Sequence, residues 1–144
     1  MPSIDRGLAM LSAIPLMILP LALYNLAMLG LFGAGGVDVL DQQLLSLSML
    51  SGAVWVMSVS DVLILLSLVI LFFEILKATM NGSGSLINHL LSMLVFIAFL
   101  VEFLLVKGAA TQTFFILMTI AFIDVVGGFT VSIRSAGRDV SIGL

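Results

Sequence analysis

Three carboxylic acids lie within long apolar stretches of this chain, and their type and position make them candidates for chemistry. Asp124 falls near the middle of the last apolar stretch, whereas Glu74 and Glu102 lie off the centres of the two stretches before it. An ionisable group at membrane depth is costly, so it is a functional candidate by default. The chemistry open to such acids is the binding or transfer of a proton or a cation.

Asp124 is the strongest of these signals. At a helical rise of about 1.5 Å per residue it lies within about 3 Å of the midpoint of its stretch, and no basic residue lies at that depth. Two interpretations stay open. Either a protonated Asp124 hydrogen-bonds across a helix interface, or it forms a proton or cation site with Glu74 below it and Glu102 above it. The second interpretation requires that the three acids share one interior face.

Small residues follow this acid on one helix face. Gly128 and Ser132 come after Asp124 at intervals of four residues, which places all three on the same side of a helix. Small residues let a neighbouring helix approach closely. We therefore predict that Gly128 and Ser132 are helix-interface residues.

The other two acids differ in their nearest basic residue. Lys77 follows Glu74 at three residues, so we expect these two side chains to pair on one helix face. Lys107 lies five residues from Glu102 and points to another face. Glu102 therefore needs a partner on another helix, or it is protonated.

Polar residues at the starts of two apolar stretches are interpreted as structural. Asp61, preceded by Ser60, is suited to cap a helix and to interact with the positive end of its dipole. His89 stands alone near the start of the third stretch, and a lone histidine there is more often structural than a ligand. We predict no ligand at either position.

The composition places these residues in a membrane. Of 144 residues, 62% are hydrophobic and 9% are charged, with five basic residues, one histidine and no cysteine. This excludes a soluble globular fold, which needs more polar surface, and a disordered chain, which needs less apolar surface. The few scattered basic residues exclude a nucleic-acid partner. Because the chain has no nucleophile arrangement and no metal-ligand set, we predict no catalytic residue, no metal, no cofactor and no enzyme activity.

Four apolar segments are long enough for a spanning helix, which needs about 20 residues. We therefore predict an all-α membrane protein, a bundle of four transmembrane helices forming a single domain over residues 1–144. Pro15 and Pro20 are expected to kink the first span, which is tolerated where neighbours satisfy the freed carbonyls. The predicted spans cover about residues 7–32, 61–78, 86–107 and 111–133.

The basic residues predict how the bundle sits in the bilayer. With four spans, both termini share one side, and that side carries four of the five basic residues. Lys107 lies on the other side. We therefore expect a multi-pass protein of the bacterial inner membrane with both termini in the cytoplasm. The four basic residues are Arg6, Lys77, Arg134 and Arg138.

Residues 37–60 are too long for a simple turn and too polar for a span. Apolar residues alternate with serines over 45–49 and again over 57–60, and this period of two is typical of strands. A Ser-Gly pair at 51–52 falls where a hairpin turn would lie. An interfacial amphipathic helix over 39–50 fits the leucine spacing equally well. Either structure is expected to lie as a lid over the outer mouth of the bundle, with the chain's tryptophan near the interface.

Five short stretches carry a resemblance to known proteins. On them the chain resembles a group of small four-helix inner-membrane proteins of proteobacteria that have no assigned function. The resemblance covers the second half of the chain and the end of the outer segment, and it implies no activity and no functional residue. The stretches are Ser51-Gly-Ala-Val-Trp55, Phe73-Glu-Ile-Leu-Lys77, Leu91-Ser-Met-Leu-Val95, Val101-Glu-Phe-Leu-Leu105 and Asp124-Val-Val-Gly-Gly128 through Arg134.

Two functions follow as expectations. The first is a non-enzymatic accessory or scaffold subunit, because few residues lie outside the membrane and four spans bury only a modest core. Such a protein is expected to form a homo-oligomer or to dock to a larger membrane complex within the lipid bilayer. The alternative is a small proton- or cation-coupled transporter or channel with Asp124 as its coupling site.

Overall fold

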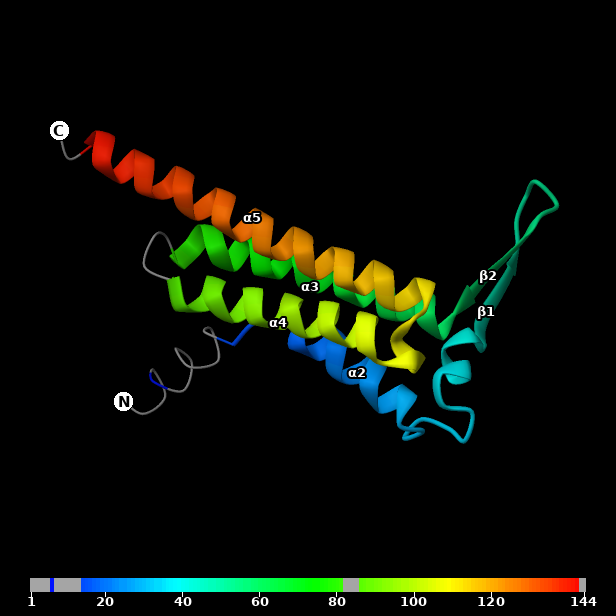
Figure 1. The fold of residues 1–144 in the computed structure, drawn as a ribbon. Coiled ribbons are helices and arrows are strands. Elements are labelled where there is room, and N and C mark those ends of the chain that lie inside the picture. The colour runs from blue at the N-terminus through cyan, green and yellow to red at the C-terminus, as the bar shows by residue number, and fades with distance from the viewer. Residues whose placement is uncertain (1–5, 7–13, 82–85, 143–144) are drawn as a thin grey trace.

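The computed structural model describes residue 6, residues 14–81 and residues 86–142 of the chain. The fold is mostly helical, with one small antiparallel sheet (Figure 1). The helices are α2 (Ile18–Met28), α3 (Val59–Asn81), α4 (Leu86–Leu105) and α5 (Gln112–Ile142), with short 3-10 helices η1 (Gly36–Asp41) and η3 (Lys107–Ala109), and the strands are β1 (Gln43–Ser48) and β2 (Val54–Ser58).

Three of these helices are long and apolar enough to cross a membrane. They correspond to the second, third and fourth predicted spans, and the hydrocarbon core that they must cross is about 30 Å thick. The length and apolar composition of these three helices thus support a membrane protein with a helical bundle. The three candidate spans are Val59–Met80, Leu86–Leu105 and Gln112–Arg134.

The first predicted span is only partly helical in the described residues, so a bundle of four spans is not confirmed. α2 has 11 residues, which corresponds to a length of about 17 Å, and residues 7–13 of that span lie outside the described residues. The chain is not helical at 14–17, and α2 begins only after Pro15. Pro20 is the third residue of α2, where the helix needs no backbone N–H, so it does not kink α2.

The long helices are arranged so that α3 and α5 run in one direction and α4 runs in the other (Figure 1). α5 packs against both α3 and α4. η1, η3 and the two strands gather at one end of the bundle, which we call the hairpin end. The end of α3, the start of α4 and the end of α5 lie at the opposite end, which we call the loop end. α2 covers only the half of the bundle nearer the hairpin end.

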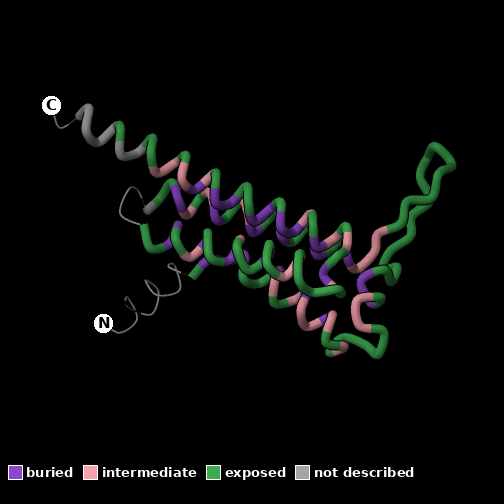
Figure 2. Tube along the Cα trace, viewed as in Figure 1, coloured by how far each residue is buried: buried purple, intermediate pink, exposed green. Residues whose placement is uncertain are grey.

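Several of the largest fully buried side chains of the core lie in or next to that half. The Tyr24 and Phe114 rings meet edge-on with their centres 4.8 Å apart, and Phe99 lies 5.5 Å from Phe114. Met17 and Leu117 are also fully buried. Figure 2 shows the buried positions facing the interior of the bundle, while the outward faces of the helices are exposed. Those exposed faces are apolar, as expected of surfaces that meet lipid.

α3 begins with a reciprocal cap, two residues earlier than the sequence suggested. The Asp61 N–H donates to the Ser58 hydroxyl at 3.3 Å, and the Ser58 N–H donates to the Asp61 carboxylate at 2.8 Å. This is a capping box, in which each side chain satisfies a backbone donor of the other. Asp61 therefore caps the helix as predicted, but the capping serine is Ser58 and not Ser60. Ser60 instead hydrogen-bonds to the Ser58 hydroxyl.

The outer segment contains a β-hairpin, so the strand interpretation is confirmed and a helix over 39–50 is wrong. β1 and β2 pair antiparallel, with Leu47 opposite Trp55. The Gly52 N–H donates to the Met49 carbonyl at 2.9 Å, and Gly52 has φ +87°, a conformation that glycine adopts without strain. The hairpin leaves the bundle sideways and does not cover its end as a lid would (Figure 1).

Candidate functional site

The first polar cluster lies within the bundle, toward the loop end, and centres on Glu74 of α3. This carboxylate is 5% exposed. Its Oε1 accepts hydrogen bonds from the Lys77 ammonium at 3.2 Å and from the Leu16 backbone N–H at 2.9 Å. The Lys77 ammonium also donates to the Ile14 carbonyl at 3.0 Å. The predicted pairing of Glu74 with Lys77 is thus confirmed, and two backbone groups join it.

Those backbone groups are free because the chain is not helical beside Pro15. Proline removes a backbone donor and clashes with the carbonyl of the preceding helical turn. The segment 14–17 therefore presents an N–H and a C=O that no helix uses, and in a bilayer such groups must find partners inside the protein. The ion pair of α3 supplies an acceptor for one and a donor for the other. The expectation that neighbours satisfy the backbone freed near the prolines is met here.

Asp124 of α5 belongs to the same region. Its side chain is 6% exposed, and it lies near enough to Glu74 and Lys77 for their charges to act on it. One turn further on, a Cβ at Gly127 would lie 3.8 Å from Ile75, so α5 and α3 pack closely at this level. Two of the three predicted acids are therefore brought together.

α4 contributes a buried histidine, His89, which packs against α5 beyond Asp124. The His89 ring is 7% exposed, hydrogen-bonds through Nε2 to the Ser132 hydroxyl and stacks on Phe129 at 5.3 Å. A Cβ at Gly128 would lie 2.9 Å from His89 Nδ1, which is closer than real contacts allow. Gly128 and Ser132 thus both face α4, where they meet the same buried histidine.

Two further buried polar residues of α4 were not predicted from the sequence. Asn88 and Ser92 are each 7% exposed, and Asn88 Oδ1 has no hydrogen-bond partner among the described residues. Both lie within one turn of His89, so the only signal in the sequence was a cluster of polar residues in the first two turns of an apolar helix.

Glu102 lies in a second polar cluster, near the hairpin end. Its Oε2 accepts a hydrogen bond from the Asn25 side-chain amide at 3.1 Å, across 77 residues of sequence. Its Oε1 is buried and has no partner among the described residues. Glu102 does find a partner on another helix, as the sequence required, but that partner is neutral.

Tyr24 extends this second cluster. Its hydroxyl donates to the Gly108 carbonyl at 2.8 Å and shares a hydrogen bond with the Thr111 hydroxyl at 2.7 Å. Thr111 in turn accepts from the Phe114 N–H at 3.2 Å and so caps α5. These contacts tie α2 to the turn between α4 and α5. The two Tyr24 contacts could not be seen in the sequence, because each joins residues that are far apart along the chain.

The three acids do not form one continuous polar cluster. On α4 alone, His89 and Glu102 are separated by about 20 Å of helix rise. The fully buried core residues Phe99, Phe114 and Leu117 lie between the two clusters along α4 and α5. Buried apolar side chains therefore separate Glu102 from Glu74 and Asp124. Within the described residues, no three His, Asp or Glu side chains are grouped so that they could hold a metal ion.

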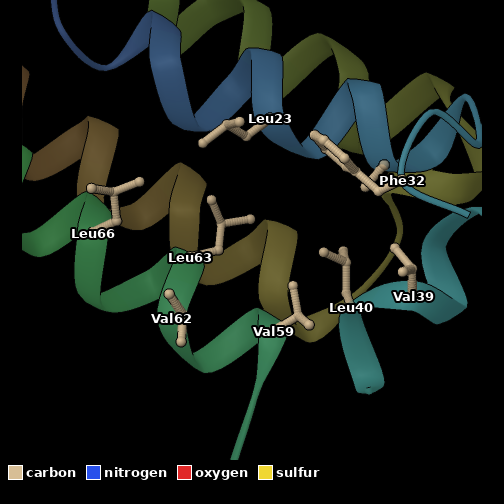
Figure 3. Close-up of a pocket in the computed structure, with 9 residues that line it drawn as sticks. Leu23, Phe32, Val39, Leu40, Val59, Val62, Leu63 and Leu66 are labelled. Atoms are coloured by element: carbon tan, nitrogen blue, oxygen red, sulfur yellow. The ribbon is translucent and has the colours of Figure 1, made fainter. Parts of the chain in front are cut away.

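An apolar groove lies at the hairpin end between α2, η1 and the first turns of α3 (Figure 3). Its volume is about 350 Å³. In Figure 3, Leu63 and Leu66 of α3 lie opposite Leu23 of α2, and η1 closes one end. The lining residues, all apolar, are Leu23, Ala27, Phe32, Val39, Leu40, Val59, Val62, Leu63 and Leu66.

The hairpin is another exposed apolar feature at this end. Leu45 and Met57 are opposite each other, as are Leu47 and Trp55, so these four side chains share one face of the sheet. Trp55 is 42% exposed and Leu47 is 46% exposed. The chain has no charged residue between Asp41 and Asp61.

The chain matches no family model, no curated protein and no solved structure. Its resemblance to small inner-membrane proteins of proteobacteria thus stays a prediction. The two polar clusters, the groove and the hairpin are the features of the chain that bear on its function.

Proposed function

We propose that this protein is a non-enzymatic accessory or scaffold subunit of a membrane complex, which binds its partner protein through the hairpin β1–β2. The observation that carries the proposal is the hairpin itself, because it is apolar, uncharged and exposed. Val54 is 62% exposed and Leu44 is 59% exposed, on a sheet of two strands. A large exposed apolar patch marks an interaction surface.

The edges of the hairpin support a protein partner. A two-stranded hairpin is only marginally stable alone, and natural proteins protect exposed strand edges with charges or prolines. Neither is present in β1 or β2. Unpaired backbone groups are costly in lipid hydrocarbon, so a partner that adds a strand suits these edges better than insertion into the bilayer does. The partner is a second copy of the chain or a different membrane protein.

The location proposed for this complex is the bacterial inner membrane, with both termini in the cytoplasm. The loop end of the bundle carries Lys77 and Arg134, whereas the hairpin end carries Lys107. Positive residues favour the cytoplasmic side. The hairpin and its partner surface then face the periplasm.

A site-specific cross-link tests the proposed function. A photo-reactive phenylalanine at Trp55 is activated in intact source membranes, and the same residue at Leu104 of α4, which is 69% exposed on the bundle, serves as the control. We expect a protein adduct from position 55 and only lipid adducts from position 104. The adduct mass must match a complex seen by native mass spectrometry after gentle extraction. Lipid adducts alone from position 55 would contradict the proposal.

A second candidate function is proton-coupled transport, and the cluster of Glu74, Lys77 and Asp124 favours it. Buried ionisable groups at membrane depth often mark proton pathways. The prediction is that Asp124→Asn abolishes proton flux into liposomes while the protein still folds, with the distant variant Glu102→Gln as the control. If Asp124 is only a helix-interface residue, Asp124→Asn leaves folding and flux as in the wild type, and absence of wild-type flux rejects transport altogether.

A further inference from the structure

We propose that the apolar groove between α2, η1 and α3 is a lipid site, which holds one acyl chain of a phospholipid whose headgroup carries a primary amine. The site is separate from the hairpin surface and is proposed in addition to the docking function. Phosphatidylethanolamine has the required chemistry. The wall of the groove, its depth in the span and the charges beside it support this assignment.

The wall of the groove accepts hydrocarbon and rejects water. Its floor includes the buried side chains of Ala27, Val39 and Leu63, and its rim is formed by Phe32 and Val62, which are exposed. No polar side chain lines it. Apolar cavities of this kind stay dry and take apolar ligands. A volume of about 350 Å³ lies in the range of small-molecule sites, about 300–1,000 Å³.

The position of the groove makes an acyl chain the occupant. Val59, Val62 and Leu66 belong to the first two turns of the candidate span Val59–Met80. The groove therefore lies where the hydrocarbon of the bilayer meets the interface at the hairpin end. A lipid of that leaflet can place one chain in the groove while its headgroup reaches the surface.

The charges beside the groove select the headgroup. Val39 and Leu40 of η1 line the groove, and their neighbours Asp38 and Asp41 are both exposed. None of the elements that line the groove, α2, η1 and the first turns of α3, carries a basic residue, and Lys107 of η3, at the same end of the bundle, is not among the lining residues. Two carboxylates attract an ammonium group, to which they can make charge-assisted hydrogen bonds, and they repel an anionic headgroup. A primary amine donates such bonds, whereas a quaternary amine does not.

Native mass spectrometry with two lipids of identical palmitoyl-oleoyl chains tests the proposal. The full chain in detergent is titrated with phosphatidylethanolamine and, separately, with phosphatidylglycerol. We expect one tightly bound phosphatidylethanolamine and a preference of about tenfold over phosphatidylglycerol, the size of one charge-assisted hydrogen bond. Equal binding of the two lipids would overturn the headgroup assignment.

Matched variants test separately the groove that holds the acyl chain and the carboxylates that bind the headgroup. Val62→Trp on the rim should fill the groove and remove the bound lipid. Val69→Trp is the control, because Val69 is also exposed on α3 but lies outside the groove, and this variant should leave the lipid bound. The double variant Asp38→Asn with Asp41→Asn should keep the lipid but lose the preference. If Val62→Trp does not fold, Leu66→Trp replaces it. Retention of the lipid by a folded groove variant would reject the site.

Discussion

Glu74 and Glu102 are the same residue type at similar distances from the centres of their helices, yet the bundle satisfies them in different ways. Glu74 receives a lysine and a backbone N–H from a segment where the chain is not helical. Glu102 receives one neutral amide from Asn25, which lies within the continuous helix α2, and keeps a second oxygen without a described partner. A non-helical segment in a membrane protein thus provides what an intact helix cannot, because only it presents free backbone groups.

The largest loss of unfolding free energy is expected from removing Glu74, the acid with more hydrogen-bond partners. Glu74→Leu leaves the Lys77 ammonium and the Leu16 N–H without their acceptor inside the bundle. Breaking such a pair costs about 3 kcal/mol of unfolding free energy, discounted somewhat because Lys77 is 17% exposed. Reversible unfolding in detergent measures it. The double variant Glu74→Leu with Lys77→Leu should regain part of the loss, because it removes the unpaired ammonium but leaves the Leu16 N–H and the Ile14 carbonyl without these partners. A double variant no better than the single one would reject the ion pair as the source of the stability.

A smaller effect is expected where α4 meets α5. Gly128→Ala places a methyl group 2.9 Å from His89 Nδ1, and overpacking of this kind costs about 1–3 kcal/mol. Gly127→Ala is the matched control, because its methyl group would meet Ile75 at an ordinary 3.8 Å. Thermal unfolding of both variants should therefore show a lowered midpoint for the first and an unchanged or raised midpoint for the second. Equal midpoints would mean that His89 moves aside without loss.

The smallest loss of unfolding free energy is expected from removing Glu102, the acid with fewer hydrogen-bond partners. Glu102→Leu removes one hydrogen bond to Asn25, but it also removes a buried oxygen that has no described partner. These two changes partly offset, so the loss of unfolding free energy should be about 1 kcal/mol. The same unfolding experiment measures it beside Glu74→Leu. A loss from Glu102→Leu equal to or larger than that from Glu74→Leu would reverse the comparison.

Contacts within one helix could be predicted, and contacts across the bundle could not. The spacing of Glu74 and Lys77 determines their pairing, because residues three apart are neighbours on any helix. The spacing of Asp124, Gly128 and Ser132 likewise predicted a close helix approach, but not that the approaching side chain is His89. The partner of Glu102 could not be identified, because it depends on how α2 lies against α4.

In the outer segment and the first apolar segment, too, local structure could be predicted but its placement in the bundle could not. Alternation of apolar and serine residues predicted the strands of the hairpin, since a strand exposes alternate residues to opposite faces. This alternation does not specify in which direction the hairpin leaves the bundle, and the expectation that it lies over the bundle as a lid was wrong. The length of the first apolar segment predicted a spanning helix over residues 7–32. In the structure the described helix α2 begins only at Ile18, after Pro15. Local sequence therefore did not reveal that the groove forms between α2, η1 and α3.

The amino-acid sequence by itself determined that this chain belongs in a membrane, where its long helices run and which residues share a helix face. These properties depend on apolar length and on the fixed periods of helix and strand. The tertiary structure decided which acids come together, which one is left with a neutral partner, where the hairpin points and where a groove remains. Those properties depend on helix packing and on backbone groups freed by proline, and each joins residues that are far apart in the sequence.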